Sequence, residues 1–313
     1  MKAVFKILLR IGITALLLFL VLHKVDFDKI LHILKNADMG FLWAVFSGNI
    51  LLFLLCAMRW HYLLLDHDIK VNYIHTLLYY LIGFFYNNFL PTVIGGGLVR
   101  AFYAGKRNNK TKQAFSSMLV ETIIGGWTLI LYSIVMAVLW LSGHRKIILS
   151  ILVIFIGATI AIFLFFERRF MGKFRVIVEK IKVLNLGEQL KELYNEMYFY
   201  KTKKGSIIKV IIISFGMQSL LGVMNFFIGL ALGFKIPFMC YMVYPAIIGV
   251  ITALPITING LGLREWGYKV FFHFNGLSGE QAITLSLVFW FIGVIASFLG
   301  AVAFLFVKLE KQK

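Results

Sequence analysis

Six apolar runs, each about as long as a bilayer is thick, divide this chain of 313 residues. A helix of roughly 20 apolar residues crosses a hydrocarbon layer of about 30 Å, where every backbone polar group needs a partner within the protein. Apolar residues make up 60% of the chain and charged residues 15%, against roughly 25% charged in soluble domains, which excludes a soluble protein. The runs cover residues 3–22, 41–64, 113–141, 146–166, 206–232 and 281–307. They predict an all-α, polytopic integral membrane bundle.

Two further apolar stretches, 72–104 and 236–272, are each interrupted by nearly the same motif. The first motif is Leu90-Pro-Thr-Val-Ile-Gly-Gly-Gly-Leu-Val-Arg100, and the second is Leu254-Pro-Ile-Thr-Ile-Asn-Gly-Leu-Gly-Leu-Arg264. A helix breaker, glycines and an arginine inside hydrophobic sequence leave backbone groups and a charge that require partners. Each stretch is therefore predicted to form a broken or re-entrant helical hairpin. Because the two motifs are so similar, the chain is also predicted to contain a duplicated unit.

The distribution of positive charge predicts how the two units are oriented. With the N-terminus inside, 23 lysines and arginines fall in cytoplasmic stretches and six on the opposite side, as the positive-inside rule requires. The first hairpin then opens to the cytoplasm and the second to the outside. The chain is thus predicted to be one transmembrane domain with an inverted-topology repeat, residues 41–141 and 206–307, a type of repeat found in secondary transporters. Both termini are expected to be cytoplasmic, in the cell membrane.

The remaining charged and terminal segments have simpler interpretations. The run at 3–22 precedes no small-residue cleavage site, which favours a retained span over a signal peptide. The formal charge of +18 is interpreted as a topology signal and not as a nucleic-acid surface, because the basic residues are scattered over loops. Residues 167–205 are predicted to be an amphipathic cytoplasmic connector, which either lies on the membrane surface or is solvated.

Three stretches carry a resemblance to a known family. Asn88 to Arg100 and Leu254 to Trp266 resemble the signature stretches of the flippase-like family built on the transmembrane region of lysylphosphatidylglycerol synthase, and Arg59-Trp60 is similar to a third family feature. The resemblance implies movement of a phospholipid across the bilayer and a cytosolic lipid-synthesising enzyme as a partner. The chain ends six residues after its last run, so no aminoacyl transfer is expected from it. Glu121 is followed by Thr122 and not by the family's arginine.

The charges inside apolar sequence predict the functional residues. Glu265 and Lys269 are four apart and are expected to pair along one helix face, with Arg264 turned away because adjacent helical side chains do not meet. Arg100 and Arg264 are then left with Glu121, and the five groups carry a net charge of +1. Arginine binds phosphate through two parallel hydrogen bonds, and helix N-termini rich in glycine bind anions. The substrate-binding residues are predicted to be Arg100, Arg264, Glu121, Gly95, Gly96, Gly97, Asn88, Asn259 and Gly260.

The predicted function is a lipid flippase or transporter that moves an anionic phospholipid or a lipid-linked headgroup through a midplane polar site. No nucleotide-binding loop, zinc-protease motif or nucleophile elbow occurs in the sequence, so no enzyme activity, cofactor or metal is expected. Three alternatives stay open. The arginines could serve only to hydrogen-bond the backbone carbonyls of their own hairpins. The protein could instead be an integral-membrane enzyme, or enzyme subunit, that handles polyprenyl-phosphate-linked sugars, or it could be a membrane scaffold. Lipid identity, direction, energy source and oligomeric state are left open by the sequence.

Overall fold

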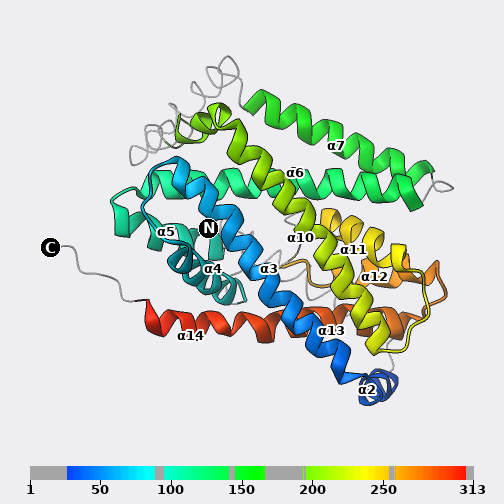
Figure 1. Cartoon of the computed structure of the whole chain (residues 1–313). Helices are drawn as coiled ribbons and strands as arrows, with labels where there is room; N and C mark the ends of the chain where they lie inside the picture. Colours follow the sequence, from blue (N-terminus) through cyan, green and yellow to red (C-terminus); the bar gives the residue numbers. More distant parts are fainter. Residues whose placement is uncertain are drawn as a thin grey trace, which may run out of the picture.

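The computed structural model describes residues 27–88, 95–140, 145–165, 193, 195–253, 257 and 259–307. Within these residues the regular structure is entirely helical (Figure 1), which confirms the predicted fold class. The elements are α2 Phe27–Lys35, α3 Met39–Asp66, α4 Tyr73–Asn87, α5 Gly95–Asn108, α6 Thr111–Trp140, α7 Arg145–Phe165, the 3-10 helix η1 Tyr200–Thr202, α10 Lys204–Ala231, α11 Phe238–Thr252, α12 Leu263–His273, α13 Gly279–Ser297 and α14 Leu299–Phe306.

Four of the predicted spans are helices long and apolar enough to cross a membrane. These are α3, α6, α10 and the run Gly279–Phe306, which comprises α13 and α14. α7 occupies the predicted span 146–166, with a shorter apolar stretch at Ile148–Ala161. The run at 3–22 lies outside the described residues. The protein is thus a polytopic helical membrane bundle.

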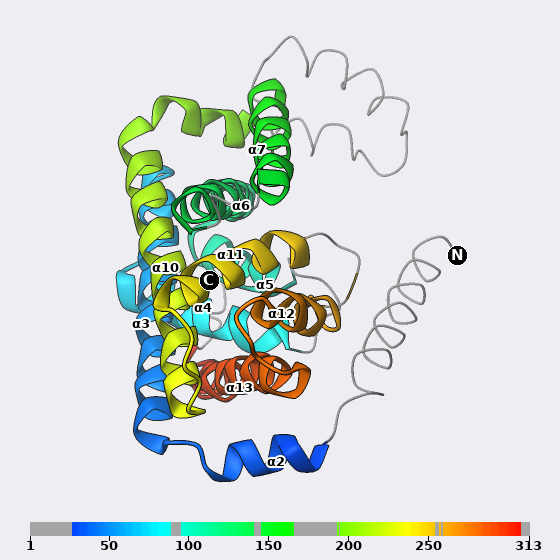
Figure 2. The same cartoon turned by 90° about the vertical axis from the view of Figure 1, so that its right-hand side faces the viewer.

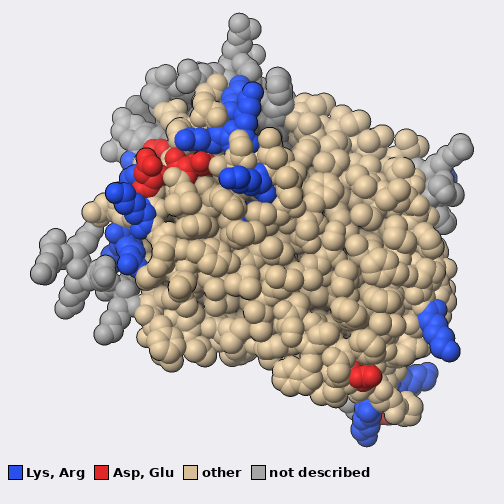
Figure 3. Space-filling view, in the orientation of Figure 1, with Lys and Arg blue, Asp and Glu red and all other residues tan. Residues whose placement is uncertain are grey.

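The surface has the character expected of such a bundle. Lysine, arginine and acidic side chains gather toward two ends of the molecule, and a broad uncharged band separates them (Figure 3). Large apolar side chains are exposed, among them Leu305 at 77% and Val153 at 68% exposure. Exposed apolar area of this extent is stable against lipid and not against water.

α3 and α10 form an antiparallel pair that runs the length of the molecule (Figures 1 and 2). The backbone N–H of Asp38, which caps the start of α3, donates to the carbonyl of Ala231 at the end of α10, with an N···O distance of 2.8 Å. At the other end, the Tyr200 hydroxyl donates to the carbonyl of Leu63 at 2.7 Å. These contacts place the end of each helix beside the start of the other.

The two hairpins attach to opposite ends of this pair. α4 follows the end of α3 directly and α5 leads into α6, whereas α11 follows the end of α10 and α12 leads into α13. In Figure 1, α4 and α5 lie to the left of the centre of the molecule, and α11 and α12 lie to the right. The inverted repeat itself stays a prediction. Re-entry into the membrane from opposite faces stays a prediction, and residues 89–94, 254–256 and 258 of the motifs lie outside the described residues.

The inner ends of the hairpins contact each other near the middle of the bundle. The Asn259 amide donates to the carbonyl of Asn87, with an N···O distance of 3.0 Å. The Asn88 amide donates to the Ser297 hydroxyl at 2.6 Å. Two asparagines of the predicted site therefore bind protein groups and join the two halves of the chain.

The predicted run 281–307 is not one helix, because it is interrupted at Phe298 between α13 and α14. The Ser297 hydroxyl donates to the carbonyl of Val294 at 2.6 Å, a local bond of the kind that bends helices. After the break, α14 packs against α4 so closely that a side-chain carbon at Gly300 would overlap the Leu81 carbonyl. The interruption thus lets α14 follow the first hairpin.

Two large apolar clusters form the core. One cluster, which includes Trp60, Tyr79 and Met118, joins α3, α4, α5 and α6. Another, which includes Tyr241 and Phe272, joins α10, α11, α12 and α13. Each also takes in residues from the other half of the chain: Met217 of α10 in the first, and Val45 of α3 and Ala137 of α6 in the second. Most of the predicted connector, 167–205, lies outside the described residues.

Candidate functional site

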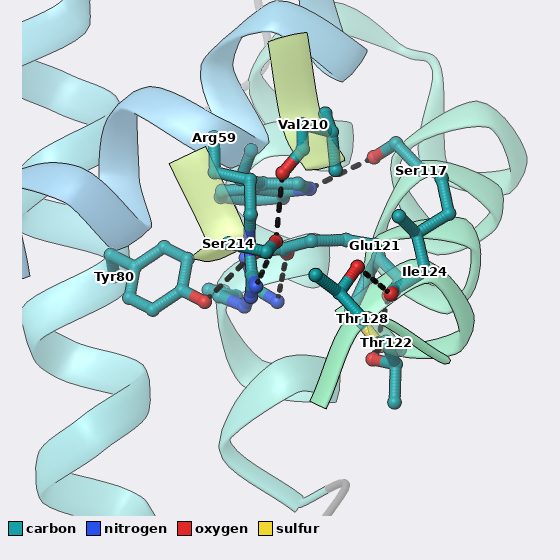
Figure 4. Close-up of polar contacts among 12 residues, drawn as sticks. Arg59, Tyr80, Ser117, Glu121, Thr122, Ile124, Thr128, Val210 and Ser214 are labelled. Carbon is teal, nitrogen blue, oxygen red and sulfur yellow. Dashed lines mark hydrogen bonds and ion pairs between the residues drawn. The ribbon is translucent and has the colours of Figure 1, made fainter. Parts of the chain in front are cut away.

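Glu121, in the middle of α6, is the centre of a buried polar cluster. Its side chain is fully buried and accepts hydrogen bonds from three helices (Figure 4). Arg59 of α3 donates through Nε to Oε1 at 2.9 Å, with Nη2 at 2.8 Å from the same oxygen. Arg100 of α5 donates to Oε2 at 2.5 Å, and the Tyr80 hydroxyl of α4 donates to Oε1 at 2.9 Å. We call these four residues the Glu121 cluster.

The neighbouring residues orient this cluster. The Trp60 indole N–H donates to the hydroxyl of Ser117 at 2.9 Å. Ser117 lies four residues before Glu121, so both face α3 from the same side of α6. Arg59 also donates through Nη1 to the Ser214 hydroxyl of α10 at 3.1 Å. The cluster therefore joins α10, from the second half of the chain, to the first hairpin.

Arg100 is held more tightly than the sequence suggested. Its guanidinium lies between the rings of Trp60 and Tyr80, with its carbon 4.4 Å and 4.1 Å from the two ring centroids. Cation–π contacts of this kind contribute up to about 2 kcal/mol where water is excluded. One guanidinium nitrogen, Nη1, is buried and has no hydrogen-bond partner among the residues that the structure describes. The Glu121 cluster therefore carries a net charge of +1 and one guanidinium NH2 group that is not used within the described residues.

The glycines before Arg100 close the first hairpin. The Gly96 N–H already donates to the Asn87 side-chain oxygen at 2.7 Å, so this group is not left bare for an anion as we expected. A side-chain carbon on Gly96 would overlap the carbonyl oxygen of Gly83 in α4. Gly95 is buried at the start of α5, and Gly97 faces the flexible side chain of Met118. Gly96 thus allows close backbone contact between the two helices of the hairpin.

Arg264 belongs to a second cluster, at the start of α12. It donates through Nε and Nη2 to Oε1 of Glu265, at 2.9 Å and 2.5 Å. The Ser286 hydroxyl of α13 accepts from the same Nε at 3.0 Å. Glu265 is fully buried, and its other oxygen accepts from the N–H of Gly262 at 2.7 Å. Arg264, Glu265 and Ser286 form the Arg264 cluster, whose net charge is zero.

Two predicted pairings are wrong. Glu265 pairs with the adjacent Arg264 and, among the described residues, not with Lys269. The rule that neighbouring helical side chains do not meet fails here, because Glu265 reaches back to the N-terminal cap of α12 while Arg264 lies in its first turn. Glu121 is also not shared by the two motif arginines, since its second partner is Arg59. The two motif arginines therefore occupy separate clusters.

A cavity of about 220 Å³ lies between α6, α10, α11 and α12, with Arg264 in its wall. Its other polar wall residues are Gln218, Asn225, Thr252 and Tyr268. Gly260, of the predicted site, has a left-handed φ of +72° and packs against Thr252. Among the described residues, Arg100 is not part of the wall.

Arg59 lies about one helical turn from the same cavity. It bonds Ser214 in α10 and approaches Gly125 in α6. Gln218 and Leu129 of the cavity wall follow these two residues by four positions each, which is a rise of about 6 Å. Among the described residues, Arg264 therefore lines this space and Arg59 lies near it, whereas the other motif arginine, Arg100, is not in its wall. The sequence offered one signal for Arg59, namely the Arg59-Trp60 pair noted in the family resemblance; nothing in it singled out Tyr80.

Comparisons with known proteins agree with this architecture. Residues 7–301 match the family described as the lysylphosphatidylglycerol synthase TM region. UPF0104 membrane protein MJ1595 of Methanocaldococcus jannaschii is 24% identical over 321 residues, which cover 96% of this chain and 95% of that protein. UPF0104 membrane protein PH1989 of Pyrococcus horikoshii is 22% identical over 308 residues, which cover 90% of each chain. The match spans both hairpins and both arginine clusters, and the chain belongs to the lysylphosphatidylglycerol synthase transmembrane-region family.

Proposed function

We propose that this protein moves an anionic phospholipid, or the anionic headgroup of a lipid-linked substrate, between the leaflets of the cell membrane. The supporting observation is the charge balance of the two clusters. Among the described residues, Arg59, Arg100 and Arg264 form ion pairs with Glu121 and Glu265 alone, which leaves one buried positive charge in excess. An unpaired charge at this depth is costly. A phosphate that entered the adjoining cavity would neutralise it.

The chemistry of the cavity suits a headgroup. Arginine presents its donors to phosphate as a planar fork, while Gln218, Asn225 and Thr252 add neutral hydrogen-bonding groups in the same wall. The contact between Asn259 and Asn87 joins the inner ends of the two hairpins beside this region. Rocking of one half against the other would open the site to each leaflet in turn, as in transporters built from inverted repeats.

Substituting lysine for Arg264, which lines the cavity, and for Arg59, about one helical turn from it, tests this function. Lysine retains the positive charge and loses the paired donors, and charge-assisted hydrogen bonds contribute about 1.5–3 kcal/mol each. We therefore expect Arg264→Lys and Arg59→Lys to slow translocation by on the order of tenfold or more. The rate is measured with a fluorescent phosphatidylglycerol in proteoliposomes, as the fraction protected from a quencher that cannot cross the bilayer.

Arg107→Lys is the matched control, because Arg107 is exposed at the end of α5, and it should translocate at the wild-type rate. Thermal unfolding of each purified variant establishes that it is folded. Wild-type rates in folded Arg59→Lys and Arg264→Lys proteins would refute the headgroup site. An enzyme acting on polyprenyl-phosphate sugars makes a different prediction, since it forms product in detergent, where no second leaflet exists.

A further inference from the structure

A second and larger cavity lies apart from both arginine clusters. It is a groove of about 570 Å³ between α6, α7, α10 and η1. Its wall is almost entirely apolar and is lined by Val120, Ile123, Ile124, Trp127, Ile207, Ile208 and Ile211, with Thr159 from α7. Trp127 and Thr159 connect its two sides, since the indole N–H donates to the threonine hydroxyl at 2.9 Å. We call this space the α6–α10 groove.

One end of the α6–α10 groove is positively charged. Lys201 of η1 and Lys204 at the start of α10 belong to its wall, and both are exposed. The Lys201 ammonium lies 5.3 Å from the centroid of the Tyr198 ring. Within the part of the chain that the structure describes, neither lysine forms an ion pair. Basic side chains gather over the region where α3 ends and α10 begins (Figure 3).

These two features require an occupant that is apolar along most of its length and anionic at one end. The apolar wall belongs to the membrane-spanning helices α6 and α10, so hydrocarbon and not water will fill it. The lysines lie at the end of the helices that the positive charges assign to the cytoplasm. A basic residue near an anionic lipid headgroup contributes attraction of its own, beyond the contact that any acyl chain would make with the wall.

We propose that the α6–α10 groove is a binding site for one anionic phospholipid of the cytoplasmic leaflet. An acyl chain lies along Ile124, Trp127 and Ile211, and the phosphate contacts the ammonium groups of Lys201 and Lys204. The Glu121 carboxylate faces α3, α4 and α5 from a different side of α6, so this lipid does not touch the buried arginines. The site is independent of whether the protein translocates lipid.

Quenching of Trp127 by brominated lipid tests the proposal in detergent micelles. The contribution of Trp127 is the difference between the wild-type protein and Trp127→Phe. Attraction of about 1 kcal/mol for each lysine corresponds to a preference on the order of 30-fold for brominated phosphatidylglycerol over brominated phosphatidylcholine. The preference should approach unity in Lys201→Gln/Lys204→Gln and should weaken as salt is added.

Lys70→Gln/Lys106→Gln is the matched control. It removes two exposed lysines from the same end of the molecule and outside the groove, and it should keep the wild-type preference. Equal quenching of Trp127 by both lipids in the wild-type protein would overturn the proposal. An unchanged preference for phosphatidylglycerol in Lys201→Gln/Lys204→Gln would also overturn it. The same result would follow if both double variants lost that preference equally. Micelles have no second leaflet, so this experiment measures binding and not translocation. A negative result in micelles would not contradict the translocation proposal, and a protein that does not translocate lipid could still bind one in the α6–α10 groove.

Discussion

Replacing Glu121 by glutamine is expected to destabilise the folded protein by about 3–5 kcal/mol, the range measured when one partner of a buried ion pair is removed. Glu121 is the carboxylate that both Arg59 and Arg100 contact. Glutamine has nearly the same shape, so the loss reflects charge and not packing. Two guanidinium groups would stay buried without an acid, and the net charge of the cluster would rise from +1 to +2.

The measurement is the free energy of unfolding in mixed micelles from a denaturant titration. Glu196→Gln is the control: that carboxylate is 28% exposed and bonds Gln113 near the end of the bundle, so its loss should cost less than about 1 kcal/mol. Glu121→Gln/Arg100→Gln restores the cluster charge to +1 and should recover part of the stability. If Glu121→Gln unfolds with the same free energy as Glu196→Gln, the cluster is not an ion-pair centre of the fold.

Gly96→Ala is the second large effect that we expect, with a loss of about 3 kcal/mol, at the upper end of what overpacked side chains cost. The new methyl group would overlap the backbone oxygen of Gly83, which cannot rotate away as a side chain can. α4 and α5 would have to separate, and the bond from Gly96 to Asn87 would lengthen. Because Arg100 lies one turn further along α5, translocation should fall as well.

Gly97→Ala is a control within the same three glycines. Its methyl group would lie 3.1 Å from the sulfur of Met118, an atom at the end of a flexible side chain. Alanine also favours a helix over glycine by about 1 kcal/mol, so Gly97→Ala should be neutral or slightly stabilising. Thermal unfolding of both variants makes the comparison. Equal melting temperatures would show that the hairpin does not depend on close backbone contact at Gly96.

Many features of this fold were predictable from the sequence because they follow from length and composition. The spans at α3, α6 and α10 are apolar over the thickness of a bilayer, and lipid offers such segments no stable form other than a helix. The paired motifs at Arg100 and Arg264 predicted two interrupted elements. The positive charges predicted opposed orientations for them, an arrangement with which the α3–α10 pair is compatible.

The partners of each buried charge were decided only by the tertiary structure. Sequence spacing favoured Glu265 with Lys269 and left Glu121 to both motif arginines, yet Glu121 binds Arg59, 62 residues away. Contacts within one helix follow from its 3.6-residue period, whereas contacts between helices depend on how each is rotated and how deeply it packs. Composition and periodicity thus determined that this is a helical membrane protein with a repeated, charged interruption. Packing in three dimensions decided which arginine reaches the cavity, because small residues such as Gly96 set how closely the helices approach.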